Sequence, residues 1–258
     1  MSVLYVYAVT RGVVEPECEG IDGTRRFGTV SAAGIAALYT PVADDEFSQE
    51  AIDRRAGDLE WLGAIGYRHQ EVVSDVMKSA AIVPLRAFTL FSSPEALRSY
   101  LVEHREMLSR AIERVAGKRE WTLRIEFDPE KWNSALVGRV PSLSALQSEI
   151  EAASPGKAFL LRKKMDEEKK RMSREAEQSA VAEIERAVVD RLSCETVSES
   201  RQAREGAFPQ INVLLERDEE SRLDELRAEL APRYEPEGIT LAVTGPWPPY
   251  TFAALKAE

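Results

Sequence analysis

The sequence predicts an α+β protein of two domains, the second with the βαββαβ order of a ferredoxin-like fold. From residue 120 onward, strand and helix patterns follow one another in that order. Just before them, Gly117 ends a helical pattern. At 258 residues the chain lies between the usual lengths of one domain and two. We therefore expect an N-terminal α+β domain over residues 1–118 and a ferredoxin-like domain over 119–258.

The N-terminal half begins with a strand pattern and continues as a mixture of strands and helices. Residues 3–9 are β-branched and aromatic, which is typical of a buried strand. From Ser48 to about Met77, apolar residues recur every three or four positions, which indicates a helix. Ser93-Pro94 indicates the start of a second helix, and Gly117 indicates its end. The sequence leaves the topology of this half open. The predicted elements are strands at 3–9, 34–40, 82–85 and 88–91, and helices at about 48–77 and 93–117.

The C-terminal half shows a clearer order. Residues 120–127 alternate polar and apolar side chains, the period of a half-buried strand, and Asp128-Pro129 ends it. A connection through Pro141 leads to a short helix and then to a long one. The remaining predicted elements are helices at about 142–152, 156–192 and 218–232 and strands at 195–201, 209–216 and 239–243, with Gly206 between the first two of these strands.

Composition excludes several classes of function. The chain carries 44 acidic and 34 basic residues, a net charge of −10, which disfavours a general nucleic-acid binder but leaves a local basic patch possible. Cys18 and Cys194 fit neither a disulfide framework nor a metal-ligand spacing. The first residues read as a strand rather than a signal peptide, and no apolar run is long enough to span a membrane. We expect a cytoplasmic protein.

Motifs for catalysis and cofactor binding are missing from the sequence. Residues 154–158 hold Gly-Lys without the upstream glycine or the hydroxyl of a phosphate-binding loop. His69 and His104, both on predicted helices, are either packed residues or candidates for a general base or metal ligand. We expect no catalytic residue, no cofactor and no metal site. The alternative is a small-molecule enzyme or sensor built on the ferredoxin-like sheet.

The long helix contains a highly charged stretch. In residues 162–175, opposite charges recur at four-residue spacing, which stabilises an isolated helix, and only Met165 and Met172 are apolar. A helix over 156–192 is about 55 Å long, so its N-terminal half should project beyond the sheet. We expect a partner-binding surface there that includes Met165, Arg171 and Met172. The alternative is a solvated helix without a partner.

The most specific short segment follows the last predicted strand. It reads GPWPPYTF, from Gly245 to Phe252. Its prolines favour an extended course, and Gly245 permits a turn out of the strand. The aromatic side chains either hold the C-terminus on the chain's own domain or dock into a partner. The candidate residues for the fold or for interaction are Gly245, Pro246, Trp247, Pro248, Pro249, Tyr250 and Phe252.

This segment closely resembles the C-terminal signature of the gas vesicle protein GvpF/GvpL family. Further segments resemble the family in the same order along the chain. After Pro84-Leu85-Arg86 the family usually has Phe-Gly-Thr, whereas this chain has Ala87-Phe88-Thr89 and so lacks the glycine of a local turn. The similar segments are LYVYAV at 4–9, IVPLRAFTLF at 82–91, GKREWTLR at 117–124, PGKAFLLRK at 155–163 and QINVLLER at 210–217.

The resemblance implies a two-domain α+β protein whose second domain is a modified ferredoxin-like fold with helical extensions. It also implies a non-enzymatic accessory or minor structural protein of gas vesicle assembly, located at the gas vesicle in the cytoplasm. Its expected partners are the shell protein GvpA and other accessory proteins of the vesicle. An acidic protein suits such a role, because a hydrophobic shell subunit aggregates unless its apolar surface is covered.

Overall fold

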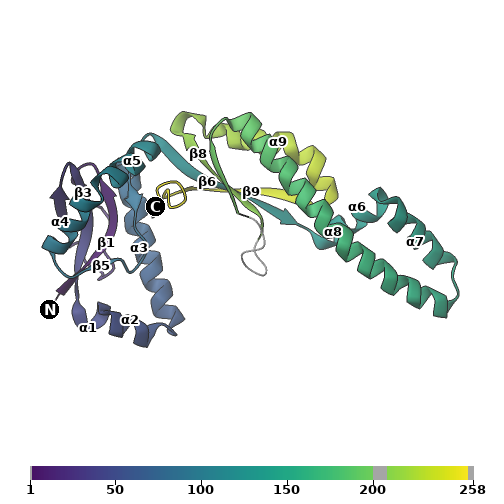
Figure 1. The fold of residues 1–258 in the computed structure, drawn as a ribbon, viewed down its shortest axis with the longest axis horizontal. Coiled ribbons are helices and arrows are strands. Elements are labelled where there is room, and N and C mark those ends of the chain that lie inside the picture. Colours follow the sequence, from purple (N-terminus) through teal and green to yellow (C-terminus); the bar gives the residue numbers. More distant parts are fainter. Residues whose placement is uncertain (1, 200–207, 255–258) are drawn as a thin grey trace. The chain divides into compact units, whose positions relative to one another are not determined.

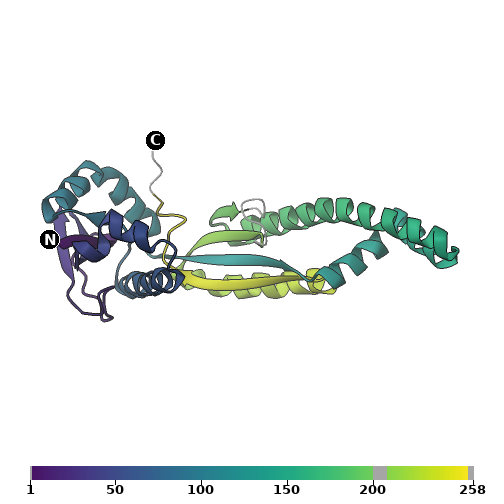
Figure 2. The same cartoon turned by 90° about the horizontal axis from the view of Figure 1, so that it is seen from below.

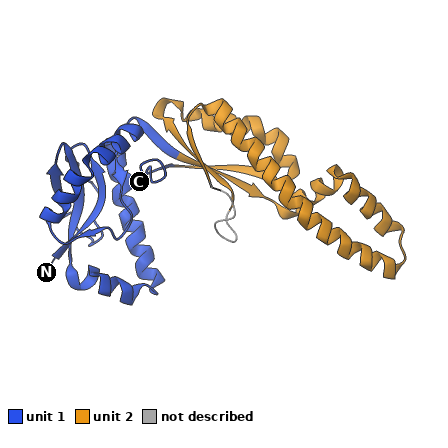
Figure 3. Ribbon diagram, viewed as in Figure 1, with its two compact units in different colours: residues 1–120, 246–258 blue, residues 121–245 orange. Residues whose placement is uncertain are grey.

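A computed structural model describes residues 2–199 and 208–254, drawn from two sides in Figure 1 and Figure 2. The chain forms two compact units, one of Met1–Glu120 with Pro246–Glu258 and one of Trp121–Gly245 (Figure 3). The chain leaves unit 1 within β6 (Lys118–Phe127) and returns to it within β9 (Ile239–Trp247). The division expected from the sequence differs at the C-terminus, because residues 246–254 belong to unit 1.

Unit 1 is built on an antiparallel sheet with β1 at its centre. The strand order is β2-β3-β1-β4, and β5 also pairs with β1. The strand expected at 34–40 continues through Pro41. Pro41 pairs with Leu4 of β1, whereas the pairing of β3 with β2 ends at Tyr39. A proline is tolerated where only one neighbour remains. The strands are β1 (Ser2–Thr10), β2 (Gly28–Ala32), β3 (Ile35–Ala43), β4 (Val83–Pro84) and β5 (Leu90–Phe91).

The helices of unit 1 are more divided than the sequence pattern predicts. Ser48 caps one helix by accepting from the Ala51 amide, and Asp58 caps the next by accepting from the Trp61 amide. The region predicted as one helix at 48–77 is therefore divided. The region predicted at 93–117 is also divided, at His104. The helices are α1 (Asp44–Phe47), α2 (Gln49–Arg55), α3 (Leu59–Ser79), α4 (Pro94–Glu103) and α5 (Arg105–Val115).

Unit 2 confirms the predicted βαββαβ order. Its sheet has the strand order β7-β8-β6-β9, the arrangement of a ferredoxin-like fold. The strand predicted at 195–201 is β7 at Glu195–Glu199, and the end of that prediction, with Gly206, lies outside the described residues. Ile184 and Val188 of α8 and Leu223 of α9 pack in the core of this sheet. The remaining elements are α8 (Pro155–Leu192), β8 (Gln210–Glu216) and α9 (Ser221–Tyr234).

Two further helices of unit 2 lie between β6 and α8. The first, α6 (Pro129–Arg139), is absent from the sequence prediction, although Asp128 caps it and Pro129 occupies its first turn. The second, α7 (Pro141–Ala152), forms a hairpin with the N-terminal half of α8. Both views show this hairpin extending beyond the end of the unit 2 sheet (Figure 1, Figure 2). Together with α6 it forms a separate apolar core, which consists of Leu136, Leu143, Leu146, Ile150 and Met165.

Candidate interaction surfaces

The C-terminal segment leaves the sheet later than its sequence suggests. Strand β9 continues to Trp247, so the expected turn out of the strand at Gly245 is wrong. Gly245 instead has a φ of +137° inside the strand, a conformation that side chains disfavour. Pro248 and Pro249 are buried, and the Pro249 carbonyl accepts from the Ala253 amide to close a turn.

Tyr250, Thr251 and Phe252, which follow the two prolines, attach this segment to unit 1. The backbone amide and hydroxyl of Thr251 donate to the two carboxylate oxygens of buried Glu120, at 3.0 and 2.7 Å. Phe252 is 1% exposed, and its carbonyl accepts from Arg114 at 2.8 Å. The Tyr250 hydroxyl lies 3.2 Å from His69 Nε2. These contacts are the physical reason that the segment belongs to unit 1, whereas the Trp247 side chain remains 43% exposed.

His69 is buried at the centre of a hydrogen-bond network. Its Nε2 lies 3.0 Å from the Leu85 carbonyl, which can only accept, so Nε2 carries a proton. Its Nδ1 lies 3.1 Å from the Tyr5 hydroxyl, which itself accepts from the Phe88 amide. Because burial disfavours the charged ring, Nδ1 accepts the hydrogen bond from the Tyr5 hydroxyl, and the imidazole is neutral.

Burial keeps this network uncharged. Desolvation lowers the pKa of His69 to about 4, and the Leu85 hydrogen bond, which favours the protonated form, offsets it only in part. Burial also raises the pKa of Tyr250 to about 12 and the pKa of Tyr7, whose ring stacks on His69, to about 12. The hydrogen-bond partners of His69 are two tyrosines and a backbone carbonyl, which fits a structural histidine better than a general base.

The structure offers little for the alternative of an enzyme. His104 ends α4, where its Nδ1 lies 3.0 Å from the Tyr100 carbonyl and its ring stacks on Tyr100. Over residues 2–199 and 208–254, no group of three His, Cys, Asp or Glu side chains is placed to hold a metal ion. In the same ranges no helix is long and apolar enough to cross a membrane.

The candidate residues on the long helix occupy different environments. Met165 is 3% exposed because it packs in the apolar core between α7 and α8. Met172 is half-buried against the same cluster. The Arg171 side chain is 58% exposed and forms ion pairs with Glu168 and Glu175 of its own helix. Only Arg171 of the three is thus open to solvent.

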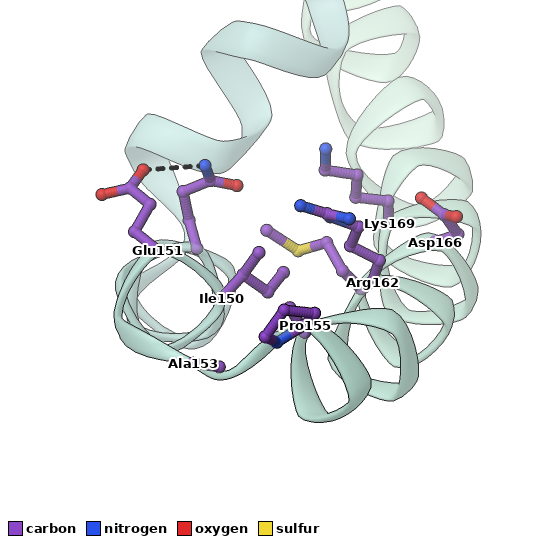
Figure 4. Close-up of a pocket in the computed structure, with 10 residues that line it drawn as sticks. Ile150, Glu151, Ala153, Pro155, Arg162, Asp166 and Lys169 are labelled. Atoms are coloured by element: carbon purple, nitrogen blue, oxygen red, sulfur yellow. Dashed lines mark hydrogen bonds between the residues drawn. The ribbon is translucent and has the colours of Figure 1, made fainter.

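Sequence reasoning missed a different surface at the start of α8. Phe159 and Leu160 are 69% and 67% exposed. A pocket of about 550 Å³ lies between α7 and α8 (Figure 4). The available signal was the apolar run Phe159-Leu160-Leu161, because three consecutive helical residues cannot all face one neighbour. The pocket is lined by Gln147, Ile150, Glu151, Ala153, Pro155, Ala158, Arg162, Met165, Asp166 and Lys169.

Comparison with known proteins identifies the family. The family described as "Gas vesicle synthesis protein GvpL/GvpF" matches residues 3–254. This chain belongs to the GvpL/GvpF family.

Individual members agree with this assignment over almost their whole length. Gas vesicle protein L of a Streptomyces species is 28% identical, with 98% of this chain and 94% of the relative covered. Gas vesicle protein L2 of Halobacterium salinarum is 29% identical, with 96% and 90% covered. The crystal structure of GvpF from Microcystis aeruginosa has the same fold, with a TM-score of 0.65 at 17% identity and 98% and 99% of the two chains covered.

Phe88 stands where the resemblance of the sequence implies a glycine. Its φ is +65°, in the left-handed region. This conformation costs a side-chain-bearing residue about 1–2 kcal/mol. The Phe88 ring packs against Trp61 at a centroid distance of 5.4 Å and against Tyr5 at 6.3 Å. Aromatic packing therefore offsets backbone strain at this position.

Two substitutions separate these effects. Phe88→Ala removes the ring and keeps the strain, whereas Phe88→Gly removes both. We expect both to lower the free energy of unfolding, and Phe88→Gly to be more stable than Phe88→Ala by about 1 kcal/mol. Urea unfolding of the full chain measures the difference. If Phe88→Ala is the more stable variant, the strain at residue 88 is refuted.

The buried His69 predicts a loss of stability in acid. Between pH 6.5, the ordinary pKa, and about 4, the unfolded chain binds a proton that the folded chain excludes. The free energy of unfolding should therefore fall as the pH drops through this range, by up to about 3 kcal/mol from His69.

The matched variant is His69→Gln, which removes this titration and keeps a polar side chain. Carboxylates contribute to the pH dependence of both proteins, so the difference between their urea-unfolding profiles isolates His69. Identical profiles between pH 7 and pH 4 would show that His69 does not cause the acid sensitivity.

Proposed function

We propose that this protein is a non-enzymatic accessory protein of gas vesicle assembly that binds the shell protein GvpA. The observation that carries the proposal is the family match over residues 3–254, which leaves no large part of the chain for a different activity. Two relatives that are named gas vesicle proteins align with more than 90% of this chain. The protein acts at the gas vesicle, in the cytoplasm, together with other accessory proteins of the vesicle.

Two features of the structure support a binding role. The His69 network satisfies both ring nitrogens with tyrosines and a backbone carbonyl, so it offers no nucleophile–base pair. Unit 2 exposes two neighbouring apolar side chains, Phe159 and Leu160, near the tip of its hairpin. Exposed apolar surface of this kind is typical of proteins that cover the apolar surface of another.

Binding and genetic tests address the proposal directly. The full chain, tagged and co-expressed with GvpA, should retain GvpA in a pull-down. A tagged acidic protein of similar net charge serves as the control for electrostatic adhesion. Deletion of the gene should abolish gas vesicles, and the gene supplied in trans should restore them. Normal flotation after deletion, together with no retention of GvpA, would contradict the proposal.

We further infer that the two compact units are the domains of the protein and that the signature segment stabilises the first of them. Support comes from Thr251 on Glu120 and from Phe252, which is 1% exposed. A docking role for the whole segment would instead need its aromatic side chains to be accessible.

Two aromatic residues of the segment form a matched pair. Phe252→Ala should lower the free energy of unfolding by about 3–5 kcal/mol, because it leaves a cavity in a packed site. Trp247→Ala, which changes a side chain that is 43% exposed, should have a much smaller effect. Thermal and urea unfolding of the full chain measure both. Equal, small effects would refute the structural role of the segment.

A further inference from the structure

The hairpin of unit 2 contains a groove with an apolar floor. The pocket of about 550 Å³ between α7 and α8 has Ile150, Ala158 and Met165 at its base, each at most 9% exposed. Two helices side by side with such a floor form the usual receptor for a third helix, whose apolar face lies in the groove.

Basic side chains flank this floor. Figure 4 shows Arg162 and Lys169 extending from α8 toward α7, on the same side as Ile150. Within the described part of the chain, neither makes a hydrogen bond or an ion pair. Glu151, on the opposite wall, is held by the Gln147 amide at 2.9 Å. The groove therefore combines a buried apolar base with two cations that form no ion pair among the described residues, although two carboxylates, Glu151 and Asp166, also line it.

The surrounding charge has the same sign. Residues 157–174 carry eight basic and three acidic side chains, a net charge of +5, whereas the rest of the chain carries −15. Exposed Phe159 lies three residues before Arg162 and seven before Asp166, which places it on the helix face that borders the groove. A basic surface with an apolar centre, on an acidic protein, is complementary to an acidic amphipathic segment.

We propose that the groove between α7 and α8 binds an acidic amphipathic helix of a partner protein. Its apolar face covers Ile150, Met165 and Phe159, and its carboxylates pair with Arg162 and Lys169. Arginine and carboxylate form charge-assisted hydrogen bonds that are stronger than neutral ones. This site goes beyond the proposed function, because it does not require the helix to belong to GvpA.

A synthetic peptide tests the site. The probe is a fluorescein-labelled 18-residue amphipathic helix with leucine on one face and glutamate on the other. The control peptide has lysine in place of every glutamate. Fluorescence anisotropy with the full chain should show saturable binding of the acidic peptide, weaker at high salt, and no binding of the basic one.

Variants on two sides of α8 locate the binding. The double substitution Arg162→Glu and Lys169→Glu should weaken binding by about tenfold or more, and Phe159→Ser by about fivefold. Lys164→Glu and Val189→Ser are the controls, since Lys164 lies two positions from Arg162 and does not share its face, and Val189 is an exposed apolar residue 30 positions from Phe159 on the same helix. The controls should change binding less than about twofold.

Circular dichroism melting verifies that each variant folds. Failure of the acidic peptide to bind would overturn the proposal. So would control variants that weaken binding as much as the groove variants, because binding would then follow overall surface charge. The GvpA pull-down is independent of this peptide assay, so the failure of one is distinguishable from the failure of the other.

Discussion

The attachment of Thr251 and Phe252 to unit 1 is the contact on which the organisation of the chain depends. Glu120, the last residue of unit 1 before the chain enters unit 2, receives both hydrogen bonds from Thr251. Glu120 is 4% exposed, and a buried carboxylate is costly unless its oxygens accept hydrogen bonds. Thr251 thus stabilises the position at which the chain leaves the first unit, so the packing of unit 1 requires residues up to Phe252.

The buried network around His69 adds specificity to this attachment. A neutral histidine that donates to Leu85 and accepts from Tyr5 has one tautomer and one orientation, so the Tyr250 hydroxyl meets a fixed partner. Fully satisfied polar networks in a core favour a single arrangement over competing ones. Such a network positions a segment that arrives from far along the sequence, and it needs no chemistry to do so.

Much of the fold could be predicted from the sequence, because local patterns encode it. The strand at β6 and the order of elements after it follow from alternating and helical periodicity. Helix α6 was missed because Asp128-Pro129 both ends a strand and caps a helix. The packing of the GPWPPYTF segment (residues 245–252) against unit 1 was also missed. Its partners Glu120, Arg114 and His69 are more than 130 residues away in sequence, and no local pattern reports such contacts.

The long helix shows why charge pattern alone misleads about a surface. The alternating charges suggested a free helix, and they direct attention to Met165, which the fold buries against α7. An exposed apolar residue is by itself no sign of a partner, as Val189, at 49% exposure on the same helix, illustrates. What distinguishes Phe159 is its surroundings, namely a buried apolar floor and two cations that form no ion pair in the described chain. Only a ligand that is both apolar and acidic satisfies both features at once, which is why the groove favours an acidic amphipathic helix over a purely hydrophobic partner.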